Sequence, residues 1–136
     1  MKYLKKYSPM ESIEEAAIKY VVSFNQVIKH SVIVTDKDKV IAASGILKKK
    51  YLGKKITEFT ERGIERRDSF VERQKKTFSF VDGVEDFGYY SFSSIICDGD
   101  TIGSVIIISV ESPILESEEK MAVILSKLLS GNFLYN

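Results

Sequence analysis

Several residue types are scarce in this chain of 136 residues, and each scarcity excludes a class of protein. There is one cysteine, Cys97, so an intramolecular disulfide framework cannot form, and a lone thiol suits a reducing cytoplasm. There is one histidine, His30, so a zinc site with several cysteine and histidine ligands cannot be assembled within one chain. We therefore expect a cytoplasmic protein with neither a metal nor a cofactor.

An excess of charge of one sign is also lacking. Lysine and arginine number 20 against 19 for aspartate and glutamate, which leaves a formal net charge of +1. This balance creates no long-range field that would gather nucleic acid or anionic lipid. No apolar run approaches the roughly 20 residues of a membrane-spanning helix, so we expect no membrane partner. At this length the chain suits a single domain with an ordinary core.

The two prolines, Pro9 and Pro113, each stand just before a helical pattern. From residue 8 to residue 29, apolar residues recur at spacings of three and four, which predicts a long helix. The same spacing after Pro113 predicts a C-terminal helix. Ile18 and Val22 lie outside the main apolar stripe of the first helix, so its apolar arc is wider than one sheet contact requires. The extra width favours a self-association surface.

Apolar runs separated by turn residues predict the strands. The runs Val32–Val34 and Val40–Ala43 flank a polar turn and predict a hairpin, whereas residues 46–70 show short helical patterns broken by glycine. Two later strands meet at Asp-Gly-Asp, residues 98–100. The last strand carries Val105–Ile108 without a polar residue, so both of its faces must be covered. We expect an α+β fold, with an antiparallel sheet between the two terminal helices and the helical crossover.

Residues that could carry catalysis do not form a recognisable pattern. The acidic residues fall into three pairs at predicted turns: Asp36 with Asp38, Asp82 with Asp86, and Asp98 with Asp100. Aspartate is favoured in turns because it hydrogen-bonds the local backbone. His30 has no catalytic partner in a motif and is interpreted as a histidine at a helix terminus. Phosphate-binding glycine motifs are absent as well, so we expect a binding protein and not an enzyme.

Four stretches of the sequence carry a resemblance to a known family: LKKYSPM, HSVIVTDKDKVIAASG, KKKYLGKKITE and CDGDTIGSVIIIS. In this order they resemble the C-terminal half of the stage V sporulation protein T family of sporulation transcription regulators. The resemblance implies a GAF-like, PAS-related regulatory domain over residues 10–136, with residues 1–9 as the remnant of a linker. It also implies that DNA is bound only through an attached AbrB-type domain, which this chain lacks.

The resemblance further implies a homodimer and a small-molecule pocket. The terminal helices would pair as a four-helix bundle, in agreement with the wide apolar arc of the first helix. The residues expected in this interface are Ile13, Ala17, Tyr20, Val21, Phe24, Met121, Leu125 and Leu128. A GAF pocket generally lies between the sheet and the crossover. The residues expected to bind an unknown small molecule there are Ser44, Gly45, Tyr51, Phe59, Tyr90, Phe92 and Ser94.

Two other functions stay open at this point. The first is a dimerisation scaffold without a ligand, in which core side chains fill the pocket. The second is a GAF-type enzyme such as the methionine sulfoxide reductases. Those enzymes rely on several cysteines, so a chain with Cys97 alone fits that function poorly.

Overall fold

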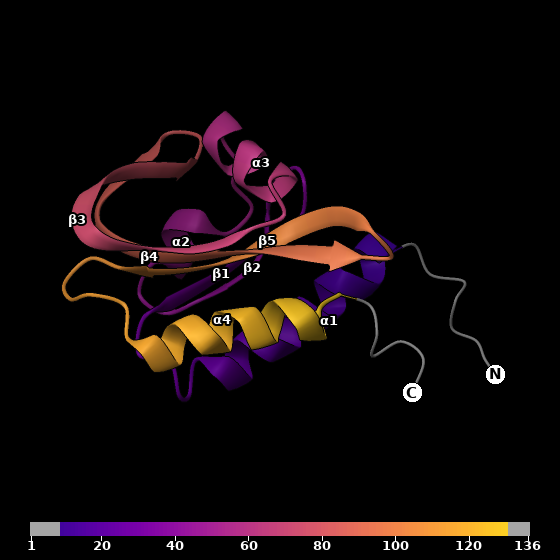
Figure 1. Cartoon of the computed structure of the whole chain (residues 1–136), viewed down its shortest axis with the longest axis horizontal. Coiled ribbons are helices and arrows are strands. Elements are labelled where there is room, and N and C mark those ends of the chain that lie inside the picture. Colours follow the sequence, from indigo (N-terminus) through magenta and orange to yellow (C-terminus); the bar gives the residue numbers. More distant parts are fainter. Residues whose placement is uncertain (1–8, 131–136) are drawn as a thin grey trace.

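The computed structural model describes residues 9–130, with side chains from residue 13 onward. The terminal helices are α1 (Pro9–Phe24) and α4 (Glu116–Leu128), and the crossover holds α2 (Lys48–Tyr51) and α3 (Glu58–Glu65) (Figure 1). The strands are β1 (Ser31–Thr35), β2 (Val40–Ser44), β3 (Ser69–Val81), β4 (Val84–Cys97) and β5 (Asp100–Ser109).

The strands form one antiparallel sheet in the order β2-β1-β5-β4-β3. The predicted hairpins are present as β1 with β2 and β4 with β5. The apolar strand β5 lies at the centre, where Ile106 is opposite Ile33 of β1 on one side and Phe92 of β4 on the other. Its residues Val105–Ile108 are fully buried. A central strand with this composition needs a layer on each face, because water would otherwise contact its aliphatic side chains.

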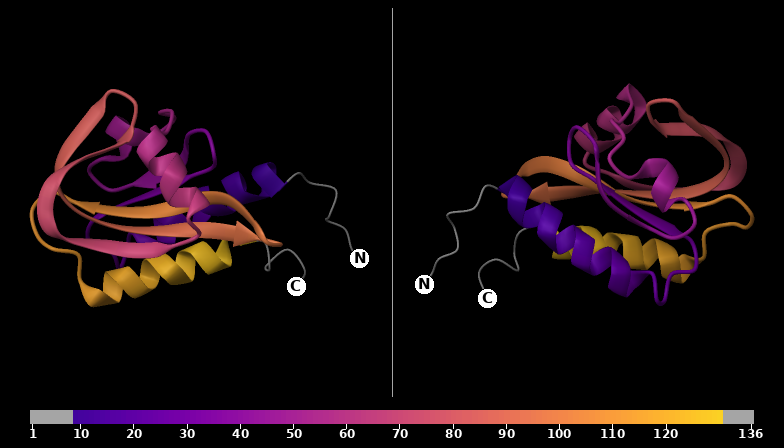
Figure 2. Two further views of the ribbon diagram at one scale, coloured as in Figure 1. Left: turned by 45° about the horizontal axis from the view of Figure 1, so that its top comes forward. Right: turned by 180° about the vertical axis from the view of Figure 1, so that it is seen from behind.

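Each face of the sheet has its own core. Helices α1 and α4 lie side by side against one face, and α2 and α3 lie across the other (Figures 1 and 2). Val105 and Ile107 belong to the core beneath the terminal helices, whereas Ile106 and Ile108 belong to the core beneath the crossover. This division is the one that the alternation along the strand predicts, and the expectation of cover on both faces is confirmed.

Two elements differ from the sequence prediction. Helix α1 ends at Phe24, about one turn earlier than expected, and the following residues form turns before the chain enters β1. Strand β3 begins at Ser69, inside the stretch that was read as helical, and it pairs with β4 from Ser69 onward. The middle of β3, residues 73–77, is polar and exposed, so this part of its sequence lacks the apolar alternation of a strand. This segment is a strand because it pairs with β4. The resulting long hairpin curls over the crossover side of the sheet (Figure 1).

Candidate functional site

The sheet face beneath α2 and α3 was expected to hold a pocket, and aromatic side chains fill much of this space. Tyr51, Phe80 and Phe92 are at most 1% exposed. Tyr90 packs edge to face on Phe80 and on Phe78, with ring centroids 4.8 Å and 5.1 Å apart. Such contacts stabilise a core beyond the burial of the rings alone. Tyr51 and Phe92, two of the expected ligand contacts, are therefore core residues of the crossover face.

Helix α2 is held to the sheet by a buried carboxylate, that of Asp86. Tyr51 Oη donates a hydrogen bond to Asp86 Oδ2 at 2.5 Å, and Lys50 Nζ lies 2.5 Å from Asp86 Oδ1. The sequence placed Asp86 at a turn, but the structure places it inside β4 on the same face as Val84 and Tyr90. The period of two along a strand brings every second residue to one face, and Asp86 falls in that series.

This contact makes the stability of the domain sensitive to alkaline pH. Burial, together with the hydrogen bond to Asp86 and its negative charge, raises the pKa of Tyr51. A phenol with a higher pKa in the folded chain gives stability that is fully present below the unfolded pKa of about 10 and is lost as the pH rises. We expect the free energy of unfolding to fall above about pH 10 by about 1.4 kcal/mol per pH unit for this group.

The variant Tyr51→Phe should lack this part of the slope, because it has no phenol to titrate. Urea unfolding at a series of pH values between about 9 and 11 measures the slope in both proteins. Tyr90, whose pKa is also raised chiefly by burial, titrates in the same direction in both proteins and so cancels from the comparison. Identical slopes would contradict the assignment to Tyr51.

Part of the crossover face stays open as a surface hollow of about 370 Å³ between α3 and the curled β3–β4 hairpin. We call it the crossover hollow. It is lined by Phe59, Lys76, Thr77, Phe78, Ser79, Glu85 and Tyr90. Phe59 and Tyr90 were both expected to contact a ligand, and the structure brings them together from α3 and β4. The aromatic rings provide an apolar surface, while Lys76 and Glu85 supply charges of opposite sign.

The remaining three expected ligand contacts do not line this hollow. Ser94 Oγ donates to two backbone carbonyls near the end of α3, at 3.1 Å and 3.2 Å, and so holds that helix to the sheet. Ser44 Oγ donates to Asn25 Oδ1 at 3.2 Å, beyond the end of α1. Gly45 has a φ of +89°, and a Cβ atom there would lie 2.6 Å from Ser31 Oγ. All three positions thus have structural roles in the chain.

The eight residues expected at a dimer interface are divided between the inside and the outside of the terminal helices. Ile13, Ala17, Val21 and Leu125 are at most 3% exposed, because they pack against the chain's own sheet. These four side chains are not available to a second copy, which corrects the expected list. The other four are partly buried: Tyr20, Phe24, Met121 and Leu128.

The outward surface of the terminal helices carries other large apolar side chains. Ile18 and Val22 on α1 are 51% and 60% exposed, and Ile124 on α4 is 52% exposed. Ile18 and Val22 are the two residues that lie outside the main apolar stripe in the sequence. Helices α1 and α4, which carry these side chains, lie side by side in one layer of the molecule (Figure 2). We call the three residues the outer helix face.

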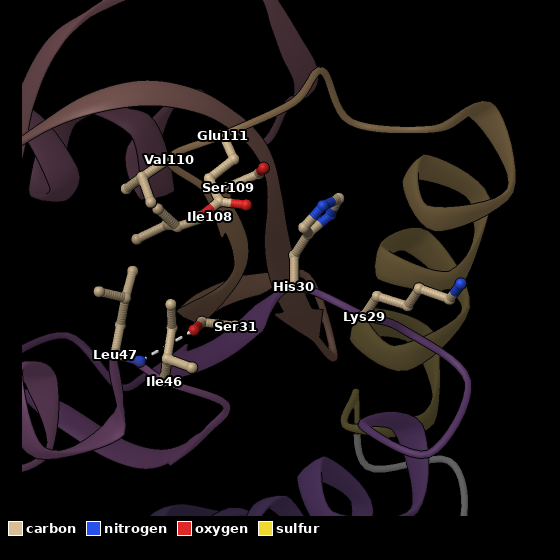
Figure 3. Close-up of a pocket in the computed structure, with 9 residues that line it drawn as sticks. All are labelled: Lys29, His30, Ser31, Ile46, Leu47, Ile108, Ser109, Val110 and Glu111. Carbon is tan, nitrogen blue, oxygen red and sulfur yellow. Dashed lines mark hydrogen bonds between the residues drawn. The ribbon is translucent and has the colours of Figure 1, made fainter.

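A second hollow, of about 290 Å³, opens at the end of the sheet where β1 begins and β5 ends (Figure 3). We call it the strand-end hollow. It is lined by Lys29, His30, Ser31, Ile46, Leu47, Ile108, Ser109, Val110 and Glu111. No residue of this set was expected to bind a ligand, because its members come from three separate stretches of the sequence that only the fold brings together.

His30 has a different partner from the one expected. Its Nδ1 atom lies 2.9 Å from Oε2 of Glu118, a buried residue in the first turn of α4. Glu118 Oε1 also accepts the backbone N–H of Leu115 at 2.9 Å. The histidine therefore joins the start of β1 to the start of α4, and the interpretation as a residue at its own helix terminus is corrected.

In the described part of the chain, the features of a reactive cysteine, a metal site or a membrane-spanning helix are lacking. Burial, followed by the nearby Asp98 carboxylate, raises the pKa of the Cys97 thiol, so the reactive thiolate is disfavoured. Among residues 13–130, no three histidine, cysteine, aspartate or glutamate side chains gather as metal ligands. Within the described range no helix is long and apolar enough to cross a membrane.

Comparison with known proteins places this geometry in a family. Residues 12–133 match the family described as stage V sporulation protein T C-terminal, transcription factor. The chain belongs to this family. Stage V sporulation protein T of Bacillus subtilis (strain 168) is 39% identical over 118 residues, which cover 86% of this chain and 66% of that protein. The chain thus spans just under two thirds of the length of this relative.

Solved structures share the fold of this family member at low sequence identity. The GAF domain from an Acinetobacter phosphoenolpyruvate-protein phosphotransferase has a TM-score of 0.70 and 13% identity, and the match covers 88% of this chain and 80% of that one. A type II free methionine-R-sulfoxide reductase from Thermoplasma acidophilum has a TM-score of 0.65 and 12% identity, with 90% and 93% covered. The GAF-like α+β fold is confirmed, and similarity at this level indicates the fold alone.

Proposed function

We propose that this domain is the regulatory and dimerisation part of a sporulation transcription regulator, and that it responds to a small molecule on its crossover face. The observation that carries the proposal is the outer helix face, Ile18, Val22 and Ile124, in a domain of a transcription factor family. DNA contact would come from a separate domain of the AbrB type. The regulatory role then lies in how two copies of this domain pack.

The dimer would form through α1 and α4. Ile18 and Val22 are four residues apart and so lie one above the other on the same side of α1. Ile124 adds an apolar side chain from α4. A second copy that presents the same helices about a two-fold axis would bury all three on each side and complete a four-helix bundle. The half-buried Met121 and Leu128 of α4 would extend this contact.

The ligand would occupy the crossover hollow. Phe59 and Tyr90 offer aromatic surface, and the hollow joins α3 to the β3–β4 hairpin. A ligand that contacts both elements can change their relative packing only if it binds two arrangements of the domain with unequal affinity. Strand β4 also contacts α4 on the opposite face of the sheet, which offers a physical connection to the dimer.

A dimerisation scaffold without a ligand is the second candidate function. It is favoured by the packing of Tyr51, Phe80 and Phe92, which leaves the interior of the crossover face filled. A reductase activity finds no support in the single cysteine, given the raised pKa of its thiol. The scaffold and the sensor share the dimer and differ only in the response to small molecules.

Thermal unfolding with pools of metabolites separates these two candidates. A ligand present at 100 times its dissociation constant stabilises the native state by about 2.7 kcal/mol, which raises the melting temperature by several degrees. We expect one pool to give such a shift, and Phe59→Ser to abolish it. The control is Phe87→Ser, which removes an exposed ring outside the crossover hollow. If no pool raises the melting temperature of the wild-type chain, the sensor is contradicted and the scaffold is supported.

A further inference from the structure

The strand-end hollow is a separate site from the crossover hollow, because the two share no lining residue. Its volume of about 290 Å³ is close to the lower end of the range of about 300 to 1,000 Å³ that is typical of small-molecule pockets. A ligand that fills it is therefore small. The chemistry of the lining restricts the ligand further, since aliphatic and polar side chains both contribute to it (Figure 3).

One side of the hollow is aliphatic. Figure 3 shows Ile46 and Leu47 together with Ile108 and Val110 on the side away from His30. Ile46 is 85% exposed, more than any other large apolar residue of the described chain. An isoleucine left in water at the edge of a hollow gains free energy when an apolar group covers it. The ligand is thus expected to carry a short aliphatic chain.

Two buried hydroxyl groups contribute polar atoms to the lining of the hollow. Ser31 and Ser109 are each 2% exposed. Ser31 Oγ accepts the N–H of Leu47 at 3.0 Å, and Ser109 Oγ accepts the N–H of Ser112 at 3.2 Å. A hydroxyl also carries a hydrogen to donate, and within residues 13–130 neither of these hydroxyls has an acceptor for it. Buried donors of this kind normally have a partner, so both can donate to ligand oxygen atoms.

Glu111 adds a negative charge to the lining, whereas the side chain of Lys29 extends away from the other lining residues (Figure 3). Glu111 is exposed, and it forms no ion pair with another described residue. A carboxylate on the ligand would accept hydrogen bonds from the serine hydroxyls, and an ammonium group would pair with the glutamate. We propose that the strand-end hollow binds a small aliphatic amino acid as the zwitterion. The proposal is independent of the dimer and of any ligand in the crossover hollow.

The position of the site gives such binding a mechanical consequence. Ser31 lies at the start of β1, just after the connection from α1, and Glu111 lies in the connection from β5 to α4. The pair of His30 with Glu118 already joins the start of β1 to the start of α4 beside the hollow. A ligand held between Ser31 and Glu111 adds a second link between the same parts of the chain, so its binding favours one placement of both terminal helices relative to the sheet.

Titration of the chain with L-leucine tests the proposal, with calorimetry for affinity and methyl NMR for the position. Two probes each lack one charge: 4-methylpentanoate has no ammonium group, and 3-methylbutylamine has no carboxylate. We expect L-leucine to bind at least about tenfold more tightly than either probe. The methyl signals of Ile46, Leu47 and Val110 should shift. Equal affinities for the three compounds, or no binding of L-leucine at about 10 mM, would overturn the proposal.

Two variants test the polar residues that line the strand-end hollow. Glu111→Gln and Ser109→Ala should each weaken L-leucine binding by about three- to tenfold, whereas Glu14→Gln, an exposed acid on α1, should leave the affinity unchanged. An unchanged affinity in both hollow variants would refute the site. A shift of the Thr77 methyl signal in place of the Ile46 signals would assign the ligand to the crossover hollow. That result would overturn this inference while leaving the proposed function in place.

Discussion

Replacing Ile18 and Val22 by glutamate should convert the proposed dimer of this domain into a folded monomer. Both side chains are more than half exposed in the single chain, so charges at these positions do not enter its core. In the proposed dimer they would be buried against a second copy, where four unpaired carboxylates cannot be accommodated. We expect the dissociation constant of the dimer to rise at least about a hundredfold. Sedimentation velocity over a concentration series measures it.

The matched control for this experiment is Val27→Glu. Val27 is 61% exposed, much like Val22, but it lies beyond the end of α1. Its replacement should leave the dimer intact. A wild-type chain that stays monomeric at about 100 μM would rule out the dimer at this surface. Leu125→Glu is not a suitable test, because Leu125 is fully buried and a charge there would unfold the chain.

The variant Asp86→Ala should lower the free energy of unfolding by about 3 kcal/mol. The change leaves the buried hydroxyl of Tyr51 without its acceptor and removes the partner of Lys50. Lys50 is nearly half exposed, so water compensates much of its loss and the tyrosine accounts for most of the effect. Urea unfolding followed by circular dichroism measures the difference in stability.

A double-mutant cycle with Tyr51→Phe separates this contact from other effects of the substitution. If the hydrogen bond dominates, Asp86→Ala should be much less damaging in the Tyr51→Phe background, because no buried hydroxyl is then left unpaired. The exposed ion pair of Glu58 with Arg62 provides the comparison, since Glu58→Ala should change the stability by less than about 1 kcal/mol. Additive losses in the cycle would contradict the assigned contact.

The experiments on the two hollows report different functional outcomes. A ligand that depends on Phe59 would support regulation through the crossover face, as in the proposed sensor. A ligand that depends on Glu111 would act where the chain leaves α1 and approaches α4. The dimer experiment is independent of both, because Ile18 and Val22 line neither hollow.

The resemblance to a known family predicted one part of the candidate site. It implied that Phe59 and Tyr90 contact a ligand on the crossover face, and both residues line the crossover hollow. The role of Asp86 was missed because an aspartate near a glycine usually indicates a turn. Nothing in the local sequence shows that Tyr51 and Lys50 lie opposite it, since they are about 35 residues away along the chain.

The helix interface was predicted from the same apolar spacing that builds the core, and this limited its accuracy. Apolar residues at spacings of three and four identify the apolar stripe of α1. This spacing does not show whether the stripe packs against the sheet of the same chain or against a second copy. In the structure the sheet takes Ile13, Ala17 and Val21, which leaves Ile18 and Val22 outside. The width of the arc indicated the apolar side chains that stay exposed, whereas the residues at the centre of the stripe pack within the chain.

The sequence by itself determined that β5 is covered on both faces and that one helix precedes and another follows the strands of a single antiparallel sheet. Both follow from local composition and periodicity, which depend on neighbours in the chain. Only the tertiary structure decided which side chains share a surface. Phe59 and Tyr90 line one hollow, and Ser31 and Ser109 line another, because sheet pairing and the crossover bring distant segments together. Local periodicity carries no information about such an arrangement.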